Sequence, residues 1–198
     1  MKNFTKFLFD FIFSLIGLLL TWWLIFFAWI IASIETKSNG LFIQKRVGKK
    51  GKLFFVLKIK TMKKITSVNT TITASNDVRI TKSGKIFRKS KIDELPQLIN
   101  VLLGQMSFVG PRPDVPGYAD NLKGEDRLVL KLRPGITGTA SLKYSNEEEI
   151  LAKQQDPIKY NDEVIYPDKV RINLDYYYNH TFIGDIKIII NTVFKTNY

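Results

Sequence analysis

The stretch SKIDELPQLINVLLGQMSFVGPRP, residues 90–113, is central to the predicted fold. Its apolar residues recur at helical spacing and make one stripe: Leu95, Leu98, Ile99, Leu102 and Leu103. Gly104 is a typical helix stop, and Pro96 is tolerated in a first turn, so the pattern predicts a helix that begins near Asp93. Asp93 and Glu94 would then lie at the helix N-terminus, where free N–H groups and the dipole favour negative charge.

This acidic pair has two interpretations from the residues alone. Acids are common in the first turn of any helix, which would be a purely structural role. Helix N-termini also bind phosphate, and Mg²⁺ bound by one or two carboxylates and by phosphate oxygens would bridge the like charges. Arginine suits a bidentate grip on phosphate, and basic residues lie on both sides of the pair. They are Arg79, Lys82, Lys85, Arg88, Lys89, Lys91, then Arg112 between two prolines, and Arg133.

The composition narrows the classes of protein and partner. The 198 residues are enough for one domain and an anchor, and 30 Lys+Arg against 18 Asp+Glu give a net charge of +12. This charge predicts an anionic partner, which is nucleic acid, anionic lipid or a phosphorylated substrate. The chain has no cysteine, which excludes disulfides and thiol chemistry. His180 is the single histidine, which excludes a metal site built on a histidine pair.

A long uncharged segment precedes this basic region. Residues 11–34 contain no charged side chain. As a helix they would extend roughly 36 Å, which is enough for a hydrocarbon core of about 30 Å and too long for the apolar part of a signal peptide. Residues 36–64 carry ten Lys or Arg and no acid after the anchor, so the positive-inside rule places the globular part in the cytoplasm, against anionic lipid. We therefore expect a membrane-inserted helix over 1–35 and a cytoplasmic domain over 36–198.

The other expected elements are short. Residues 41–62 alternate around a basic turn and predict a β-hairpin, so the expected class is α+β, mainly helical with one hairpin. The remaining segments are a surface loop over 63–77, a stiff extended turn over 107–117, a short amphipathic helix over 118–132, a tight turn over 133–138, a polar helix over 146–156, a helical or mixed segment over 168–179, and an apolar tail over 182–194 that suits either the membrane interface or the core.

Separated blocks of the chain resemble the bacterial sugar transferase family, the monotopic polyprenyl-phosphate hexose-1-phosphate transferases. They are Lys58-Ile59-Lys60-Thr61-Met62; Asp77-Val78-Arg79-Ile80-Thr81 with Gly84 and Arg88; Asp93-Glu94-Leu95-Pro96-Gln97-Leu98 with Asn100-Val101-Leu102 and Met106-Ser107-Phe108-Val109-Gly110-Pro111-Arg112-Pro113; and Arg133-Pro134-Gly135-Ile136-Thr137-Gly138.

The resemblance implies a reaction. Family members move a sugar 1-phosphate from a UDP-sugar to undecaprenyl phosphate, release UMP, and so start the assembly of a capsule, exopolysaccharide, lipopolysaccharide O-antigen or glycoprotein glycan. It implies that Asp93 is the nucleophile and a ligand of Mg²⁺, or of Mn²⁺, and that Glu94 assists as a metal neighbour or in proton handling. The expected phosphate contacts are Lys58, Lys60, Arg79, Arg88, Arg112 and Arg133.

The resemblance also implies a location and partners. The enzyme would sit in the bacterial inner membrane with its catalytic domain on the cytoplasmic face. Its partners would be the UDP-sugar, undecaprenyl phosphate, anionic membrane lipid and either glycan-assembly proteins or a second copy of the chain, without nucleic acid. UDP-glucose, UDP-galactose and amino-sugar donors all fit.

The chain departs from the family pattern at specific positions. The family's N-terminal helix is usually broken by a Ser-Pro pair and leaves by the face it entered, whereas this segment has Trp22-Trp23 and no proline. We expect a re-entrant helix by resemblance, with Ser14 and Gly17 as its weak points, and a spanning helix as the alternative. Gln105 stands where the family commonly has Asp, and Thr139 stands where it often has an aromatic residue. Residues 141–157 and 166–178 resemble one branch of the family, which bears on sugar choice.

Two other classes of function compete with the enzyme. A membrane-tethered basic protein would bind nucleic acid, another anionic polymer or anionic lipid through its lysines, but this function gives no reason for an acidic pair near Arg112. A catalytically inactive relative would serve as a scaffold in a glycan-assembly complex. Gln105 is its support, and the intact Asp93-Glu94 pair counts against it.

Overall fold

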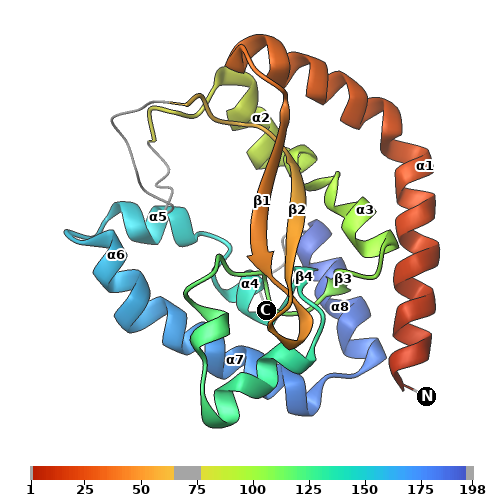
Figure 1. Ribbon diagram of the computed structural model, residues 1–198, viewed down its shortest axis with the longest axis vertical. Helices are drawn as coiled ribbons and strands as arrows, with labels where there is room; N and C mark the ends of the chain where they lie inside the picture. The colour runs from red at the N-terminus through yellow and green to blue at the C-terminus, as the bar shows by residue number, and fades with distance from the viewer. Residues whose placement is uncertain (1, 65–76, 195–198) are drawn as a thin grey trace.

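The computed structural model describes residues 2–64 and 77–194, so most of the loop expected over 63–77 lies outside the described residues. The long apolar helix α1 (Lys2–Thr36) follows one edge of the molecule, and an α+β domain lies beside it (Figure 1). The helices of the domain are α2 (Lys82–Ser90), α3 (Gln97–Leu102), α4 (Thr139–Lys143), α5 (Glu147–Ala152), α6 (Pro157–Tyr160), α7 (Tyr166–Asn179) and α8 (Phe182–Phe194). This architecture confirms the expected α+β class.

Helix α1 bends near its middle although it contains no proline (Figure 1). Hydroxyl groups there donate to carbonyls one turn back: Thr21 Oγ1 lies 2.7 Å from the Gly17 oxygen, and Ser14 Oγ lies 3.0 Å from the Phe11 oxygen. Such bonds compete with the helical ladder and commonly bend helices. Gly17 also admits α3, because a Cβ at this position would lie 3.1 Å from Leu98 Cδ1. Back-bonding and close packing therefore take the place of a proline.

Both arms of the bent helix pack against the same domain. In the first arm, Asp10 accepts a hydrogen bond from Arg133 Nη2 at 2.8 Å. In the second arm, Ala32 is fully buried in an apolar cluster with Ile59 and Phe87. A straight helix of this length would hold its ends roughly 50 Å apart. The bend therefore lets both ends of α1 reach one side of the domain.

The predicted β-hairpin is confirmed. Strand β1 (Leu41–Val47) pairs antiparallel with β2 (Leu53–Ile59) in a two-stranded sheet. The outer edge of β2 is covered by the side chain of Asn100, which accepts from Leu57 N at 3.1 Å and donates to Phe55 O at 2.8 Å. These bonds satisfy backbone groups that a sheet edge would leave open. They also join the hairpin to α3.

The acidic pair lies in a 3₁₀ turn, η2 (Ile92–Glu94), and α3 begins only at Gln97. The prediction that an α-helix begins near Asp93 is therefore wrong by about one turn. Lys91 reverses the chain with a left-handed φ of 59°, and Pro96 has no N–H to continue an α-helical ladder backward. The Glu94 amide donates to Lys91 O, so it is not a free donor of a helix N-terminus.

The segments 107–117 and 133–138, which contain proline and glycine and were expected to form turns, contribute one strand each to a parallel pair. Strand β3 (Ser107–Val109) pairs with β4 (Gly135–Thr137). Glycine is required where the two segments approach each other, because a Cβ on Gly135 would lie 2.2 Å from Gly110 N. A parallel pairing joins distant segments, so neither segment alone predicts it. The pairing fixes the start of the loop that carries Arg112.

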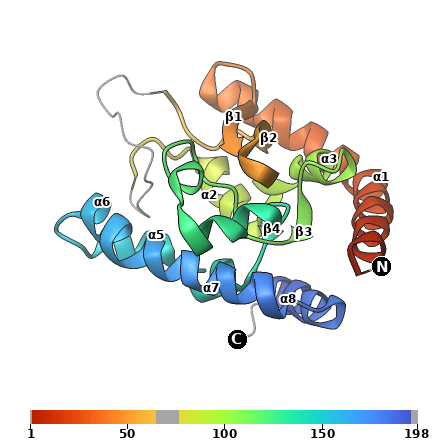
Figure 2. The same ribbon diagram turned by 60° about the horizontal axis from the view of Figure 1, so that its bottom comes forward.

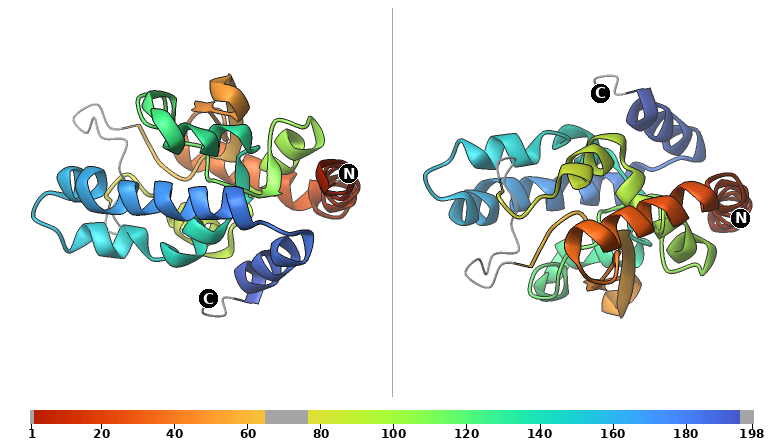
Figure 3. Two further views of the ribbon diagram at one scale, coloured as in Figure 1. Left: turned by 90° about the horizontal axis from the view of Figure 1, so that it is seen from below. Right: turned by 90° about the horizontal axis from the view of Figure 1, so that it is seen from above.

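The later elements complete the domain. The amphipathic helix expected over 118–132 is wrong: the segment forms 3₁₀ turns, η3 (Ala119–Asn121) and η4 (Gly124–Lys131), and Gly124 has a φ of +55°. The expected helix over 146–156 is the shorter α5, and helix α7 is confirmed. In Figures 2 and 3, α5 and α6 lie on the side of the domain away from the start of α1.

The apolar tail is helix α8, and it serves the core and the surface together. Ile188 is buried against Val109 and Tyr176. On its other face Ile183 and Val193 are 71% and 68% exposed.

Candidate active site

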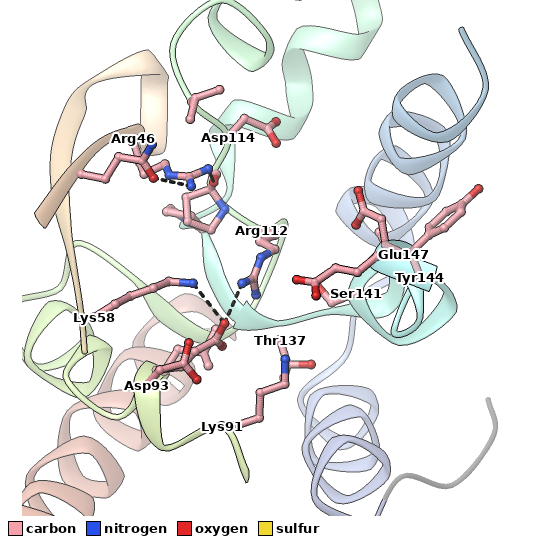
Figure 4. A pocket seen from close by; sticks show the side chains of 18 of the residues that line it. Arg46, Lys58, Lys91, Asp93, Arg112, Asp114, Thr137, Ser141, Tyr144 and Glu147 are labelled. Carbon is pink, nitrogen blue, oxygen red and sulfur yellow. Dashed lines mark hydrogen bonds and ion pairs between the residues drawn. The ribbon is translucent and has the colours of Figure 1, made fainter. Parts of the chain in front are cut away.

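A large open cleft of about 2830 Å³ contains the acidic pair. One wall is the inner face of the hairpin, with Arg46 and Lys58, and the opposite wall carries Tyr144 and Glu147 (Figure 4). The cleft exceeds the 300–1,000 Å³ that is usual for one small ligand. It is large enough for a bulky polar ligand together with a second reactant.

Glu94 is held by two cations on the same oxygen. Its Oε1 lies 2.6 Å from Arg112 Nη2 and 3.1 Å from Lys58 Nζ. The two cations approach from different elements, β2 and the loop after β3 (Figure 4). Burial alone would raise the pKa of Glu94, but the charges of Arg112 and Lys58 outweigh burial and hold that pKa well below its usual range. Glu94 is therefore ionised, and it orients both cations.

Asp93 is in the opposite electrostatic situation. It is 7% exposed, and its Oδ1 has no hydrogen-bond partner among the described residues. Burial and the neighbouring Glu94 charge raise the pKa of Asp93 above the ordinary value. Buried polar atoms are normally paired, so an unpaired carboxylate oxygen in a cleft is a candidate reactive group.

The two cations have different exposure. The Arg112 side chain is 45% exposed, so part of its guanidinium group remains open to the cleft beyond Glu94. The Glu94 charge raises the pKa of Arg112, which stays cationic. The Lys58 side chain is 21% exposed, and burial together with the Arg112 charge lowers the pKa of Lys58. An anion in the cleft would meet Arg112 and Lys58 beside Asp93.

Three further predicted contacts line the same cleft, and each has a partner. Lys60 Nζ donates to Ser38 Oγ at 2.9 Å, Arg79 pairs with Asp77, and Arg88 pairs with Glu148. Arg133 does not line this cleft. Its guanidinium group is ion-paired with the buried Asp10 and lies 5.3 Å from the ring of Phe7. The structure thus brings all the predicted site residues to one cleft except Arg133.

Sequence reasoning missed polar groups on the far parts of the cleft. Thr139 Oγ1 and Tyr166 Oη are buried, line the cleft, and have no hydrogen-bond partner in the described part of the chain. Asp114 also lines it, and burial raises its pKa to about 6. Burial and the Arg112 charge lower the pKa of Arg46, opposite Asp114, to about 10. Of these positions, only Thr139 had been noted from the sequence, as a difference from the family pattern.

Gln105 lies outside the cleft. Its Oε1 accepts from Asn100 Nδ2 at 2.8 Å, and so supports the side chain that covers the edge of β2. The residue at this position therefore acts on the hairpin, and Gln105 contacts neither carboxylate of the acidic pair.

Replacing Asp114 by Asn is expected to stabilise the protein at neutral pH. A folded-state pKa of about 6, above the ordinary 3.8, means that stability falls as pH rises from about 4 through 6, because the unfolded chain releases its proton first. Asp114→Asn removes this loss. The melting temperature should therefore differ less between pH 5 and pH 7.5 in the variant than in the natural chain. For a chain of this size, each kcal/mol of stability corresponds to about 2–4 °C in melting temperature. A variant less stable at pH 7.5, with the exposed Asp126→Asn unchanged, would contradict this.

The acidic pair fits a magnesium ion shared with a bound phosphate better than a metal site made by the protein alone. The described residues contain no group of three or more His, Cys, Asp or Glu side chains placed to hold a metal. Mg²⁺ typically uses one or two carboxylates together with substrate phosphates and water. Asp93, with its unpaired Oδ1, is the residue that would bind the ion, because Glu94 is already engaged by two cations.

Comparison with known proteins gives consistent results along the chain. Residues 1–197 match the family model described as bacterial sugar transferase. One curated relative is the UDP-glucose:undecaprenyl-phosphate glucose-1-phosphate transferase of Klebsiella pneumoniae, 36% identical over 173 residues, which are 84% of this chain and 35% of the relative. The UDP-N-acetylgalactosamine-undecaprenyl-phosphate N-acetylgalactosaminephosphotransferase of Aeromonas hydrophila is 32% identical over 84% of this chain and 36% of the relative.

A third relative has nearly the same length as this chain. The exopolysaccharide production protein PSS of Rhizobium leguminosarum bv. phaseoli is 34% identical over 93% of this chain and 91% of the relative. The chain spans only about a third of the two longer relatives, so the match to them covers one part of those proteins.

Proposed function

The chain belongs to the bacterial sugar transferase family, and from this premise we propose that it transfers a sugar 1-phosphate from a UDP-sugar to undecaprenyl phosphate, with release of UMP. The product would be the lipid diphosphate sugar that starts a surface glycan. The names of the relatives specify different sugars, glucose in one and N-acetylgalactosamine in another. The donor of this chain is therefore proposed only as a UDP-sugar.

The observation that carries the proposal is the asymmetry of the acidic pair. Glu94 binds Lys58 and Arg112, while one buried oxygen of the neighbouring Asp93 has no partner within the described part of the chain and lies in a basic cleft. A diphosphate in the cleft would be attracted to Arg112 and Lys58, which places its phosphorus atoms next to Asp93. Phosphoryl transfer depends mainly on such positioning and charge stabilisation.

In the proposed first step, a carboxylate oxygen of Asp93 attacks the phosphorus that bears the sugar. A bond forms between Asp93 and that phosphorus, and the bond from phosphorus to the bridging oxygen breaks, so UMP leaves with the electron pair. In the second step an oxygen of undecaprenyl phosphate attacks the same phosphorus and Asp93 leaves as a carboxylate. Covalent catalysis by a carboxylate divides one difficult transfer into two.

Glu94 has an orienting role in this proposal. A carboxylate whose pKa is held well below the usual range is a weak base, so it is poorly suited to take a proton from the incoming phosphate. Its bonds instead hold Arg112 and Lys58 at one point of the cleft. Both cations can then act on the phosphoryl oxygens with little reorganisation.

A Mg²⁺ ion bound by Asp93 and the donor diphosphate, when present, would neutralise part of the phosphate charge. We expect chelator to abolish UMP release, and Mg²⁺ or Mn²⁺ to restore it. Because the ion needs phosphate oxygens as ligands, chelator should leave the melting temperature of the substrate-free protein unchanged. Full activity in excess chelator would contradict the metal requirement, and a lower melting temperature in chelator would indicate a site built by the protein alone.

The bent helix α1 suits a re-entrant anchor on the cytoplasmic face. It is the helix of the described residues that is long and apolar enough to cross a membrane, over Phe4–Thr36. Its two arms contact the same domain through Asp10 and Ala32, which a helix crossing straight through a bilayer could not do. Trp22 and Trp23, 63% and 51% exposed in the middle of α1, would then reach the deepest level of the anchor. The cleft would open near the bilayer surface, where both substrates can arrive.

The unpaired hydroxyls of the cleft are candidates for contacts to hydroxyl or carbonyl groups of the UDP-sugar. Replacing Tyr166 by Phe removes such a contact, so we expect KM for the donor to rise roughly 2- to 10-fold with kcat little changed. The free energy of unfolding should be equal or higher, because the lost hydroxyl is buried and has no partner among residues 2–64 and 77–194. Steady-state kinetics and thermal unfolding measure both, with Tyr177→Phe as a control outside the cleft. Lower stability with unchanged KM would show that the hydroxyl is structural.

The direct test is UMP release by the purified chain in detergent, with undecaprenyl phosphate, Mg²⁺ and a panel of UDP-sugars. Lipid-dependent UMP from one donor would support the proposal and identify the sugar. If folded protein released UMP from none of the donors, including rare amino sugars, the inactive scaffold would become the better explanation.

A further inference from the structure

A second cavity lies at the start of α1, apart from the cleft that holds the acidic pair. Its volume is about 310 Å³. We call it the basic cavity, because the polar side chains that line it are Lys6, Lys49, Lys131, Arg133, Tyr176 and His180. They come from α1, the turn of the hairpin, η4, the segment before β4, and the end of α7. No acidic residue lines it in the described part of the chain.

Carboxylates hold part of this wall from behind. Lys6 is paired with Asp185, and Arg133 with Asp10. Asp185 and Asp10 are 4% and 1% exposed, so both are shielded from the cavity by the cations that they hold. The Tyr176 hydroxyl donates to Asp185 as well. These buried bonds keep the side chains in place without offering negative charge to a ligand.

Other donors of the basic cavity remain available. Lys49 and Lys131 have no ion pair with the described residues, and Lys131 Nζ lies 5.9 Å from the ring of Tyr177. His180 Nδ1 lies 3.0 Å from the backbone oxygen of Tyr176, so this nitrogen is already engaged by the backbone and the free donors among the described lining residues are the two lysines. The wall therefore carries four cationic side chains against two buried carboxylates, so its net charge is positive and an anion would be attracted to it. The four are Lys6, Lys49, Lys131 and Arg133.

The surroundings of the basic cavity are apolar and exposed. Phe7, which lines the cavity, is 44% exposed, and Leu103, bonded to the lining residue Gly104, is 64% exposed. Phosphate chemistry at the cavity would thus adjoin surface that suits hydrocarbon. Charged headgroups with adjacent acyl chains have this combination of properties.

We propose that the basic cavity binds a phosphate group, and that this phosphate is the headgroup of an anionic membrane lipid whose acyl chains lie along the neighbouring apolar surface. The lipid would fix the first arm of α1 at the bilayer surface. The site is separate from the cleft with Asp93, so the inference does not rest on the proposed reaction.

The test uses the full chain in a zwitterionic detergent and three probes: dihexanoyl phosphatidylglycerol, dihexanoyl phosphatidylcholine and inorganic phosphate. Binding is followed by ³¹P line broadening and by the shift of the melting temperature. Lys49→Gln with Lys131→Gln removes donors of the cavity. Lys52→Gln with Lys123→Gln removes the same charge from exposed lysines of the neighbouring hairpin turn and the start of η4, outside the cavity.

We expect phosphatidylglycerol to bind the natural chain and the control double variant with equal affinity. We expect it to bind the cavity double variant with an affinity lower by about tenfold or more. Inorganic phosphate that bound as tightly as phosphatidylglycerol would keep the phosphate site and overturn its assignment to a lipid. Equal weakening by both pairs of variants would overturn the site, since only net charge would then matter. Equal binding of phosphatidylcholine would also overturn it. Because the four replaced lysines are exposed, unfolding of the variants is not an expected outcome.

Discussion

Replacing Asp93 by Asn should reduce UMP release by about 10⁴-fold or more, the scale of loss when a nucleophile is removed. The amide keeps the size of the carboxylate but cannot attack phosphorus to form an acyl phosphate. Two measurements check this. One is UMP release with donor and lipid acceptor, and the other is trapping of labelled sugar phosphate on the protein when the acceptor is omitted. Both signals should disappear in Asp93→Asn.

The same variant should fold at least as well as the natural chain. Burial and the Glu94 charge raise the pKa of Asp93, so at neutral pH its ionised form costs the folded state free energy that asparagine does not. We therefore expect an equal or higher melting temperature at pH 7.5. Asp126→Asn, an exposed change of the same kind, should alter neither activity nor stability. If Asp93→Asn kept most of its UMP release or still trapped label, the assignment of the nucleophile would be wrong.

Replacing Asp10 by Ala should cost about 3–5 kcal/mol of stability, the usual penalty for breaking a buried ion pair from one side. Asp10 is 1% exposed and accepts from Arg133 Nη2 at 2.8 Å, from Phe108 N at 3.1 Å and from Ser107 Oγ at 3.2 Å. Alanine leaves all of these donors unpaired. Thermal unfolding in detergent should show a fall of roughly 6–20 °C at about 2–4 °C per kcal/mol.

A double-mutant cycle with Arg133→Met separates the ion pair from general packing. Replacing both partners by apolar residues should recover part of the stability lost in Asp10→Ala, because no buried charge is then left alone. The cycle also examines the role first expected for Arg133. A structural arginine predicts that Arg133→Met lowers stability while folded protein keeps kcat. A fall in kcat without a loss of folded protein would support the original assignment of Arg133 as a phosphate contact.

The sequence alone predicted the local features of the site. Alternation around a basic turn specified the hairpin, because period-2 patterning is a property of neighbouring residues. The unbroken apolar segment specified helix α1. The pair Asp93-Glu94 was also readable as a motif, with Lys58 and Arg112 among the predicted phosphate contacts. Each of these depends on residues that are close in the chain or on a compact block of resemblance.

The bend of α1 shows where local reasoning stops. Ser14 and Gly17 were identified as weak points, but the partner that selects one path is Leu98 on α3, far along the chain. Similarly, the Pro-Gly segments predicted turns, because a turn is the local property of proline and glycine. Their parallel pairing needs Gly110 and Gly135 to meet, which only the packed domain can bring about.

The sequence by itself determined which groups are available: an apolar helix, a hairpin, an acidic pair and many cations. The tertiary structure decided which of them act together. In the folded chain Lys58 and Arg112 pair with Glu94, Oδ1 of Asp93 has no partner among the described residues, and Arg133 pairs with Asp10 instead of lining the cleft. The physical reason is that ion pairing and burial depend on distance in space, and a buried charge takes whichever partner the fold brings within a few ångströms.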